Sequence, residues 1–287
     1  MTEFQNPSLE LRARVALDKH GFHNSHSLGQ NFLMDEGLLN SLLDAAAVGP
    51  EDRVLEIGPG PGVMTALLAR RCRSVLAVEV DRDLEPVLQD VLAGTENAEV
   101  RFQDILKADM DALTGDGPYR VVANLPYYIT ADILLRLVTA EHAPESIAIM
   151  VQKEAAERVM SRPGMKAWCA LAATVQSYGE AEVLVEVPSE AFNPPPHVEN
   201  RFIIIRRHTT PIVTSGDERL YLKVISAAFA MRRKTLANNL RAAFGLDQSA
   251  AADALERAGL DARVRGEALS LQELSRLSDV LYDMGTR

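Results

Sequence analysis

The sequence predicts an α/β fold in which a mostly parallel, doubly wound sheet with an antiparallel edge is followed by a small all-helical domain. Short apolar strands alternate with helical patterns between residues 53 and 152, which is typical of parallel sheets covered by helices. A glycine-rich turn follows the first strand, and only helical patterns occur after residue 218. Since the chain has 287 residues, 47% of them apolar, we expect two domains, 1–210 and 211–287, divided near 209–216.

Each element has a local signal in the sequence. A helix over 9–20, a loop over 21–31 and a second helix over about 36–48, capped by Asp35, precede the sheet. The parallel strands are expected at Arg53–Ile57, Ser74–Val80, Glu99–Gln103, Tyr119–Asn124 and Ile147–Gln152, with helices at 62–71 and 84–92. The antiparallel edge is expected at Glu182–Val187 and Arg201–Arg207, and the C-terminal helices at Arg219–Ala230, Thr235–Phe244, Ala250–Ala258 and Leu271–Met284.

Charge is distributed unevenly along the chain. The net charge of −10 argues on its face against a nucleic-acid partner. Residues 201–245, however, carry nine Lys and Arg against two acidic residues, a net +7. Such a local basic face remains compatible with RNA binding. The candidate RNA contacts in this segment are Arg206, Arg207, Arg232, Arg233 and Lys234.

The composition points to a cytoplasmic protein. Cys72 and Cys169 are the two cysteines and lie far apart, so we expect free thiols in a reducing compartment. No apolar run approaches the ~18 residues that span a bilayer, and the first ten residues do not resemble a signal peptide. His20, His23 and His26 are spaced by three but lack a fourth ligand, and we expect no metal site.

A strand, a tight turn and the start of a helix are combined in Val54–Thr65, where Gly58, Gly60 and Gly62 are spaced G-x-G-x-G. Val63 stands where the dinucleotide fingerprint has its third glycine. The spacing is instead typical of enzymes that bind S-adenosylmethionine, a ligand without a phosphate. The glycines therefore predict a cofactor loop of that kind.

Two carboxylates follow the next two strands. Glu79 ends the second strand, where a carboxylate can accept hydrogen bonds from both ribose hydroxyls of a nucleoside. Asp104 follows the third strand, where it can accept from the exocyclic amine of adenine. Because ligands of open α/β sheets bind at the carboxyl ends of the strands, these residues support a nucleoside cofactor.

The fourth strand ends in the stretch Asn124-Leu125-Pro126-Tyr127-Tyr128-Ile129-Thr130, "NLPYYIT". The asparagine oxygen and the carbonyl before proline are two acceptors for the two hydrogens of an amino group. Tyr127 offers a flat face to a base, whereas loop packing is the simpler explanation of Tyr128. The pattern favours a planar amine held for methyl transfer by positioning, which requires the target base to leave its stack.

At this point the chain resembles the ribosomal RNA adenine N6-dimethyltransferase family, and its bacterial small-subunit members most. The resemblance covers roughly residues 22–285. It is carried by "SLGQNFLMD" (27–35), "EIGPGPGVMT" (56–65), "VEVDRDL" (78–84), "QDIL" (103–106), "NLPYYIT" (124–130), "VQKEAAERVMSRPGMK" (151–166), "VPSEAFNPPPHVENRFIII" (187–205) and "AFAMRRKTLANNL" (228–240). The chain departs from the family pattern at His26, Ser27 and His197, where basic residues are usual, and at Trp168-Cys169, where Tyr-Gly is common.

The resemblance implies roles for individual residues. S-adenosylmethionine would be bordered by Gln30, Asn31, Leu33, Gly58, Gly60, Gly62, Glu79, Asp104 and Asn124. Catalysis would belong to Asn124, Leu125, Pro126 and Tyr127, with Phe192 stacking on the target base opposite Tyr127. The segment 228–240, which contains Arg232, Arg233 and Lys234, would be an RNA-facing helix.

The resemblance implies methylation at N6 of two adjacent adenosines in the 3′-terminal hairpin of 16S rRNA, in the small subunit or its precursor, by a cytoplasmic monomer. Two alternatives compete with this function. One is a 23S rRNA adenine methyltransferase of the antibiotic-resistance type, which the segment "RRKTLANNL" disfavours. The other is a non-catalytic assembly or transcription factor on the same fold. The intact glycine loop, Glu79, Asp104 and Asn124 argue against this second alternative.

Overall fold

The chain forms two compact units in the computed structural model, which describes residues 7–25, 28–210 and 216–286. The first unit comprises Met1–Ala156 and Ala181–Arg206, and the second comprises Glu157–Glu180 and Arg207–Arg287. This division differs from the predicted domains, because residues 157–180 cluster with the C-terminal helices. Most of the predicted boundary, at 211–215, lies outside the described residues.

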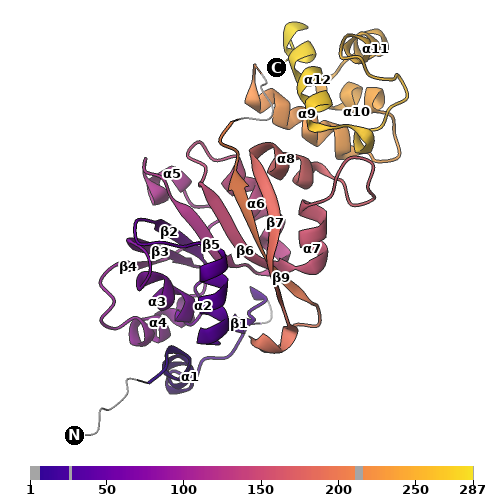
Figure 1. The fold of residues 1–287 in the computed structure, drawn as a ribbon. Helices are drawn as coiled ribbons and strands as arrows, with labels where there is room; N and C mark the ends of the chain where they lie inside the picture. The colour runs from indigo at the N-terminus through magenta and orange to yellow at the C-terminus, as the bar shows by residue number, and fades with distance from the viewer. Residues whose placement is uncertain (1–6, 26–27, 211–215, 287) are drawn as a thin grey trace, which may run out of the picture. The chain divides into compact units, whose positions relative to one another are not determined.

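A seven-stranded sheet organises the first unit, and its strands run in the order β4-β3-β2-β5-β6-β9-β7 (Figure 1). Neighbouring strands are parallel from β4 to β6, and β9 is antiparallel to β6. The strands are β2 Arg53–Ile57, β3 Ser74–Glu79, β4 Ala98–Phe102, β5 Arg120–Asn124, β6 Ser146–Gln152, β7 Gly179–Val187 and β9 Asn200–Arg207. The predicted sheet and its antiparallel edge are confirmed.

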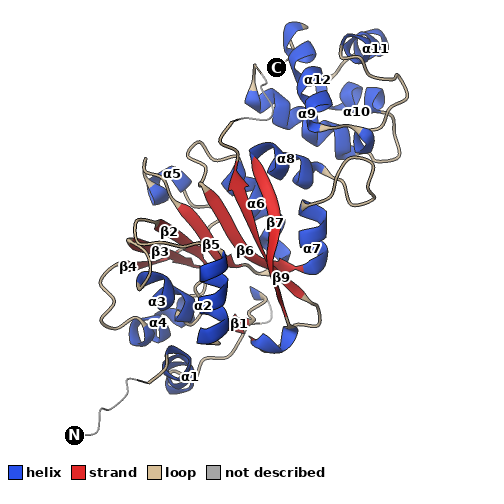
Figure 2. Cartoon of the chain, viewed as in Figure 1, coloured by secondary structure: helices blue, strands red, loops and turns tan. Residues whose placement is uncertain are grey.

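Helices lie on both sides of the strands in Figure 2. Those before and between the parallel strands are α1 Leu9–Lys19, α2 Glu36–Ala45, α3 Val63–Ala69, α4 Glu85–Val91, α5 Met110–Thr114 and α6 Thr130–Val138. The side chain of Asp35 accepts a hydrogen bond from the backbone N–H of Leu38 at 2.8 Å, so it caps α2 as predicted. A two-stranded ladder pairs β1 Phe32–Leu33 with β8 Phe192–Asn193, and no local pattern in the sequence predicts this pairing.

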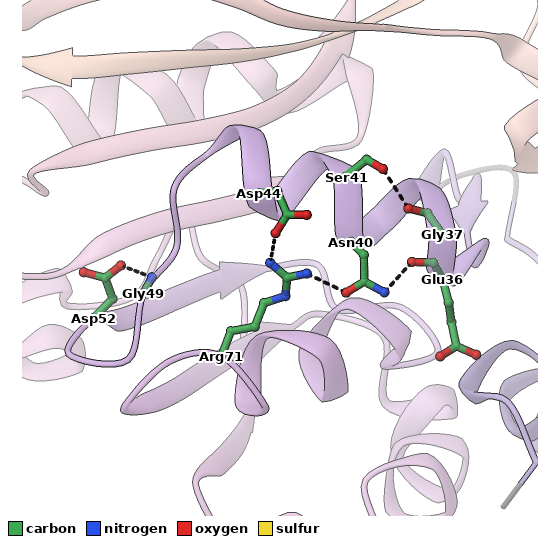
Figure 3. Close-up of polar contacts among 8 residues, drawn as sticks. All are labelled: Glu36, Gly37, Asn40, Ser41, Asp44, Gly49, Asp52 and Arg71. Carbon is green, nitrogen blue, oxygen red and sulfur yellow. Dashed lines mark hydrogen bonds and ion pairs between the residues drawn. The ribbon is translucent and has the colours of Figure 1, made fainter. Parts of the chain in front are cut away.

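Arg71, which follows α3, ties that helix to α2 (Figure 3). Its guanidinium pairs with the carboxylate of Asp44 and donates to Oδ1 of Asn40 at 2.7 Å. Asn40 in turn donates to the carbonyl of Glu36 at 2.7 Å. The two helices are thereby fixed side by side, and α2 keeps Leu39 and Leu42 against the cavity described below.

The second unit is helical around one apolar core. Its helices include α8 Ala170–Tyr178, α9 Glu218–Ala230, α10 Leu236–Phe244, α11 Gln248–Arg257 and α12 Leu271–Asp283, while α7 Lys153–Val159 spans the division between the units. Trp168 is fully buried, packs edge-on against Phe229 and donates from its indole nitrogen to the carbonyl of Leu269 at 3.2 Å. This burial explains why residues 157–180 belong with the C-terminal helices.

Candidate active site

A cavity of about 240 Å³ opens at the carboxyl ends of β2, β3 and β5. It lies where the sheet order changes direction, since β2 pairs with β3 on one side and with β5 on the other. Eleven of the predicted cofactor and catalytic residues line it: Gln30, Asn31, Leu33, Gly58, Gly60, Glu79, Asp104, Asn124, Leu125, Pro126 and Tyr127. The position agrees with the general rule for ligands of open α/β sheets.

Glu79 is held by three backbone amides. Its Oε1 accepts from the N–H groups of Val80 at 2.8 Å and Asp81 at 2.9 Å, and its Oε2 accepts from Gly60 at 3.2 Å. The residue is only 5% exposed. Burial raises the pKa of Glu79, and these three hydrogen bonds oppose the rise. The carboxylate is therefore oriented against the cavity, with lone pairs remaining for two hydroxyl donors.

The glycines of the loop have different surroundings. Gly60 has φ +55°, and a Cβ there would lie 3.0 Å from the ring of Phe32. A Cβ at Gly62, where φ is +87°, would lie 2.9 Å from the side chain of Leu88 on α4. Gly62 is absent from the described lining of the cavity. Its position thus permits close packing between α3 and α4, and contact with the cofactor stays a prediction.

Asp104 lines the cavity but has other partners as well. Its Oδ1 accepts from the N–H of Leu106 at 3.0 Å, and its Oδ2 pairs with Lys107 at 3.1 Å. The Leu106 amide, and then Lys107, hold the pKa of Asp104 below its ordinary value. The residue is thus ionised at neutral pH and able to accept a further donor.

The loop before β1 is fastened to the sheet through Gln30. Its Nε2 donates to Oδ2 of Asp81 at 2.6 Å, and its Oε1 accepts from the N–H of Ser25 at 2.7 Å. Asp81 lies two residues beyond Glu79, so this bond joins the loop to the end of β3. Gln30 therefore fixes one border of the cavity.

Asn124, the last residue of β5, is oriented by the same loop. Its Nδ2 donates to the carbonyl of Asn31 at 3.0 Å. This bond fixes the orientation of the side-chain amide, whose acceptor atom is Oδ1. The glycine loop is close by, since a Cβ at Gly58 would lie 3.6 Å from the carbonyl oxygen of Asn124.

Tyr127 is half-buried and has a partner that sequence reasoning missed. Its hydroxyl donates to Oδ1 of Asn200 at 2.7 Å, and Asn200 donates to the carbonyl of Val198 at 3.1 Å. Asn200 is fully buried at the start of β9. Burial raises the pKa of Tyr127, and the bond to Asn200 opposes the rise. No local motif marks Asn200, because the contact bridges 73 residues of sequence.

Two aromatic residues lie elsewhere than expected. Phe192 is 4% exposed, packs in the hydrophobic core and is absent from the described cavity lining. It pairs across the β1–β8 ladder with Leu33, which does line the cavity. Its stacking on a base stays a prediction. Tyr128, expected to pack in the loop, is 60% exposed and lines the cavity, so that interpretation is wrong.

Glu56 is a second residue that the sequence analysis overlooked. It lies on β2, is fully buried, and neither carboxyl oxygen has a hydrogen-bond partner among the described residues. Burial raises the pKa of Glu56 to about 8; the Thr65 hydroxyl, which makes no hydrogen bond of regular geometry to Glu56, opposes this rise, and the Glu79 carboxylate adds to it. A neutral carboxylic acid therefore lies beneath the glycine loop at neutral pH.

The five candidate RNA-binding residues lie in two places, at the end of β9 and in the turn between α9 and α10. Arg206 forms an ion pair with Glu182, and Arg207 is exposed. Arg232, Arg233 and Lys234 are exposed in the turn between α9 and α10, so their predicted place on a helix is wrong. Arg232 is also held within its unit, because it donates to the carbonyl of Lys166 at 2.8 Å and pairs with Glu267 at 3.3 Å.

His197, His26 and Ser27 stand where the family usually has basic residues. His197 is exposed, whereas His26 and Ser27 lie outside the described residues.

Within residues 7–25, 28–210 and 216–286, no helix is long and apolar enough to cross a membrane. The same residues contain no cluster of His, Cys, Asp or Glu that could hold a metal ion.

Comparison with known proteins agrees with this geometry. The model of the family described as "Ribosomal RNA adenine dimethylase" matches residues 21–281. The chain belongs to this family. Ribosomal RNA small subunit methyltransferase A of Enterococcus faecalis is 39% identical over 98% of both chains. The protein of that name from Shouchella clausii is 43% identical over 94% of both chains.

Solved structures show the same fold. A dimethyladenosine transferase from Plasmodium falciparum superposes with a TM-score of 0.76 at 22% identity, over 89% of this chain and 98% of that one. The 23S rRNA methyltransferase ErmE superposes with a TM-score of 0.65 at 26% identity, over 88% and 100%. As a ribosomal RNA adenine dimethylase, the chain is an S-adenosylmethionine-dependent methyltransferase. This argues against the non-catalytic alternative, and the cavity's acceptors and apolar walls fit that cofactor.

Proposed function

We propose that this dimethylase methylates N6 of two adjacent adenosines in the 3′-terminal hairpin of 16S rRNA, in the small subunit or its precursor. The relatives named for the small subunit are 39–43% identical over 94–98% of the chain. ErmE, named for 23S rRNA, is 26% identical. The difference favours the small-subunit substrate over the 23S alternative. We also propose that the enzyme acts as a monomer in the cytoplasm, a reducing compartment that its free thiols fit.

The observation that carries the chemistry is the orientation of Asn124. Asn31 engages its amide nitrogen, so Oδ1 can accept one hydrogen of the adenine amine. We assign the other hydrogen to the carbonyl of Leu125, a residue that lines the cavity and precedes Pro126. Two acceptors on one nitrogen draw its lone pair out of the ring and aim it at the methyl donor. No strong base is needed, because the nitrogen's proton becomes acidic only as the new bond forms.

The other residues position the reactants. S-adenosylmethionine supplies the methyl group when bound, with Glu79, Gln30, Asn31, Leu33, Gly58, Gly60 and Asp104 as its borders. The bound cofactor would give its methyl group to the amine nitrogen and leave as the neutral thioether, and the nitrogen would lose one proton. Tyr127, held by Asn200, offers its ring to the flipped adenine. This reaction relies on positioning and on removal of water.

Methyl transfer to isolated ribosomal subunits tests the proposal. Purified enzyme and tritiated S-adenosylmethionine are incubated with small and large subunits that lack the modification, and the rRNA is digested to nucleosides. We expect label in the small subunit alone, recovered as dimethyladenosine at two neighbouring positions. Label in the large subunit, or in a different nucleoside, would refute the proposed substrate.

A further inference from the structure

Tyr128 is a large aromatic side chain left in water at the edge of the catalytic cavity. Its side chain is 60% exposed, although it lines the cavity in the short 3₁₀ helix Tyr127–Ile129. Val80 also lines the cavity and is likewise exposed, at 53%. Exposed aromatic surface beside a binding site commonly marks a contact with a ligand. The roles given above to Asn124 and Tyr127 do not use this ring.

The surroundings of Tyr128 hold its ring without covering it. Gly29 has φ +61°, and a Cβ there would lie 3.6 Å from Cε1 and 3.7 Å from Cδ1 of Tyr128. The ring therefore lies beside Gly29, in the loop that carries Gln30, and a Cβ there would make only an ordinary van der Waals contact with it. Tyr127 differs from Tyr128 because it is half-buried and its hydroxyl is bonded to Asn200. Both tyrosines thus line the cavity, but Tyr127 is half-buried while Tyr128 is exposed to solvent.

We propose that Tyr128 is a stacking platform for the RNA base next to the target adenosine, an inference that rests on the proposed function. When the target base leaves its stack, the neighbouring base loses a stacking partner. The Cα atoms of Tyr127 and Tyr128 are about 3.8 Å apart, so a chain that delivers one base to Tyr127 brings its neighbour near Tyr128. Stacking on an aromatic ring accepts any base. Tyr128 then positions substrate and takes no part in bond formation.

Three variants separate stacking from other roles. Methyl transfer to small subunits is measured for wild type, Tyr128→Ala and Tyr128→Phe, with cofactor affinity measured by calorimetry. We expect Tyr128→Ala to raise KM for the subunit about 10-fold, the scale of one lost base–aromatic stack. Tyr128→Phe keeps the ring and should behave as wild type. Cofactor affinity should be equal in all three, which also shows that the variants fold.

A double-mutant cycle identifies the partner base. Small subunits are reconstituted on ligated 16S rRNA in which the nucleotide 5′ or 3′ to a target adenosine is abasic. One of these changes should slow the wild type about 10-fold and leave Tyr128→Ala without further loss. Equal losses in both enzymes, or a Tyr128→Ala variant with unaltered KM, would overturn the inference, as would weakened cofactor binding. A wild type that fails to label the unmodified subunit would instead refute the proposed function.

Discussion

The hydroxyl of Tyr127 donates a 2.7 Å hydrogen bond to Oδ1 of Asn200, which is fully buried at the first residue of β9. This bond joins the segment after β5 to a strand on the far side of β6. It fixes the plane of the Tyr127 ring, because the hydroxyl and the backbone are both restrained. The ring face that we propose for the target adenine therefore depends on a residue that lies 73 positions away in the sequence.

Removal of Asn200 should release that ring. In Asn200→Ala, we expect the rate of methyl transfer to fall about 10-fold, since a positioned ring is lost, while cofactor affinity stays unchanged. Tyr127→Phe should cost roughly 1–3 kcal/mol of stability, because it leaves a buried acceptor without its donor. Thermal unfolding and single-turnover kinetics of both variants and of the double variant measure these effects. Additive losses in the double variant would show that the two residues do not act together.

Loss of the Glu79 carboxylate should weaken cofactor binding. Glu79→Gln keeps the size of the side chain but removes a charged acceptor, so we expect a loss of roughly 1.5–3 kcal/mol, the scale of hydrogen bonds to a charged group. Calorimetry with S-adenosylmethionine measures it. Glu99→Gln is a matched control, because Glu99 is exposed and pairs with Arg101 on β4. Equal affinities in the two variants would remove Glu79 from the ribose site.

Glu56 should make stability depend on pH. Its pKa is about 8 in the folded protein against an ordinary value of 4.5, so the folded state binds the extra proton between these pH values. The contribution of Glu56 to the free energy of unfolding is fully present below about pH 4.5, and it is lost as the pH rises toward 8. Glu56→Gln should therefore increase the free energy of unfolding at pH 9 by on the order of a few kcal/mol and raise the Tm there. At pH 5 the substitution should leave the Tm unchanged. If the Tm difference between Glu56→Gln and wild type is the same at both pH values, Glu56 is not a buried neutral acid in the folded protein.

The turn between α9 and α10 should contact RNA mainly through Arg233 and Lys234, because Arg232 already bonds Lys166 and Glu267. Arg233→Ala/Lys234→Ala should lower the slope of log K against log[salt] for subunit binding by roughly 1.4–1.8. Arg14→Ala/Lys19→Ala removes the same charge from α1 in the other unit and should leave the slope unchanged. Equal slopes for the two double variants would indicate that the turn is merely solvated.

The sequence specified the sheet well because its strands are short apolar runs between glycine and proline signals. Glu79 and Asn124 were predictable, since each ends a parallel strand and such ends converge at one edge. Asn200 and Glu56 were not, because a long-range hydrogen bond and a desolvated carboxyl leave no local pattern. The placement of residues 157–180 depended on the burial of Trp168, which sequence periodicity does not reveal.

The exposure of aromatic side chains was the least predictable feature. Tyr127, Tyr128 and Phe192 are all aromatic residues in motifs of the family, yet they are half-buried, exposed and buried respectively. Both tyrosines line the cavity, yet only the hydroxyl of Tyr127 is bonded to the buried Asn200, while the side chain of Tyr128 stays exposed. The role of each ring therefore has to be read from the fold.

The role of Asn124 is tested most directly by Asn124→Ala. Cofactor affinity from calorimetry and single-turnover methyl transfer to small subunits are measured on the same preparations. If Oδ1 holds the adenine amine, affinity for S-adenosylmethionine stays nearly unchanged while the transfer rate falls about 100-fold or more, as when a positioned polar group is lost from a reaction centre. A variant that binds cofactor normally and transfers methyl groups at close to the wild-type rate would contradict this role.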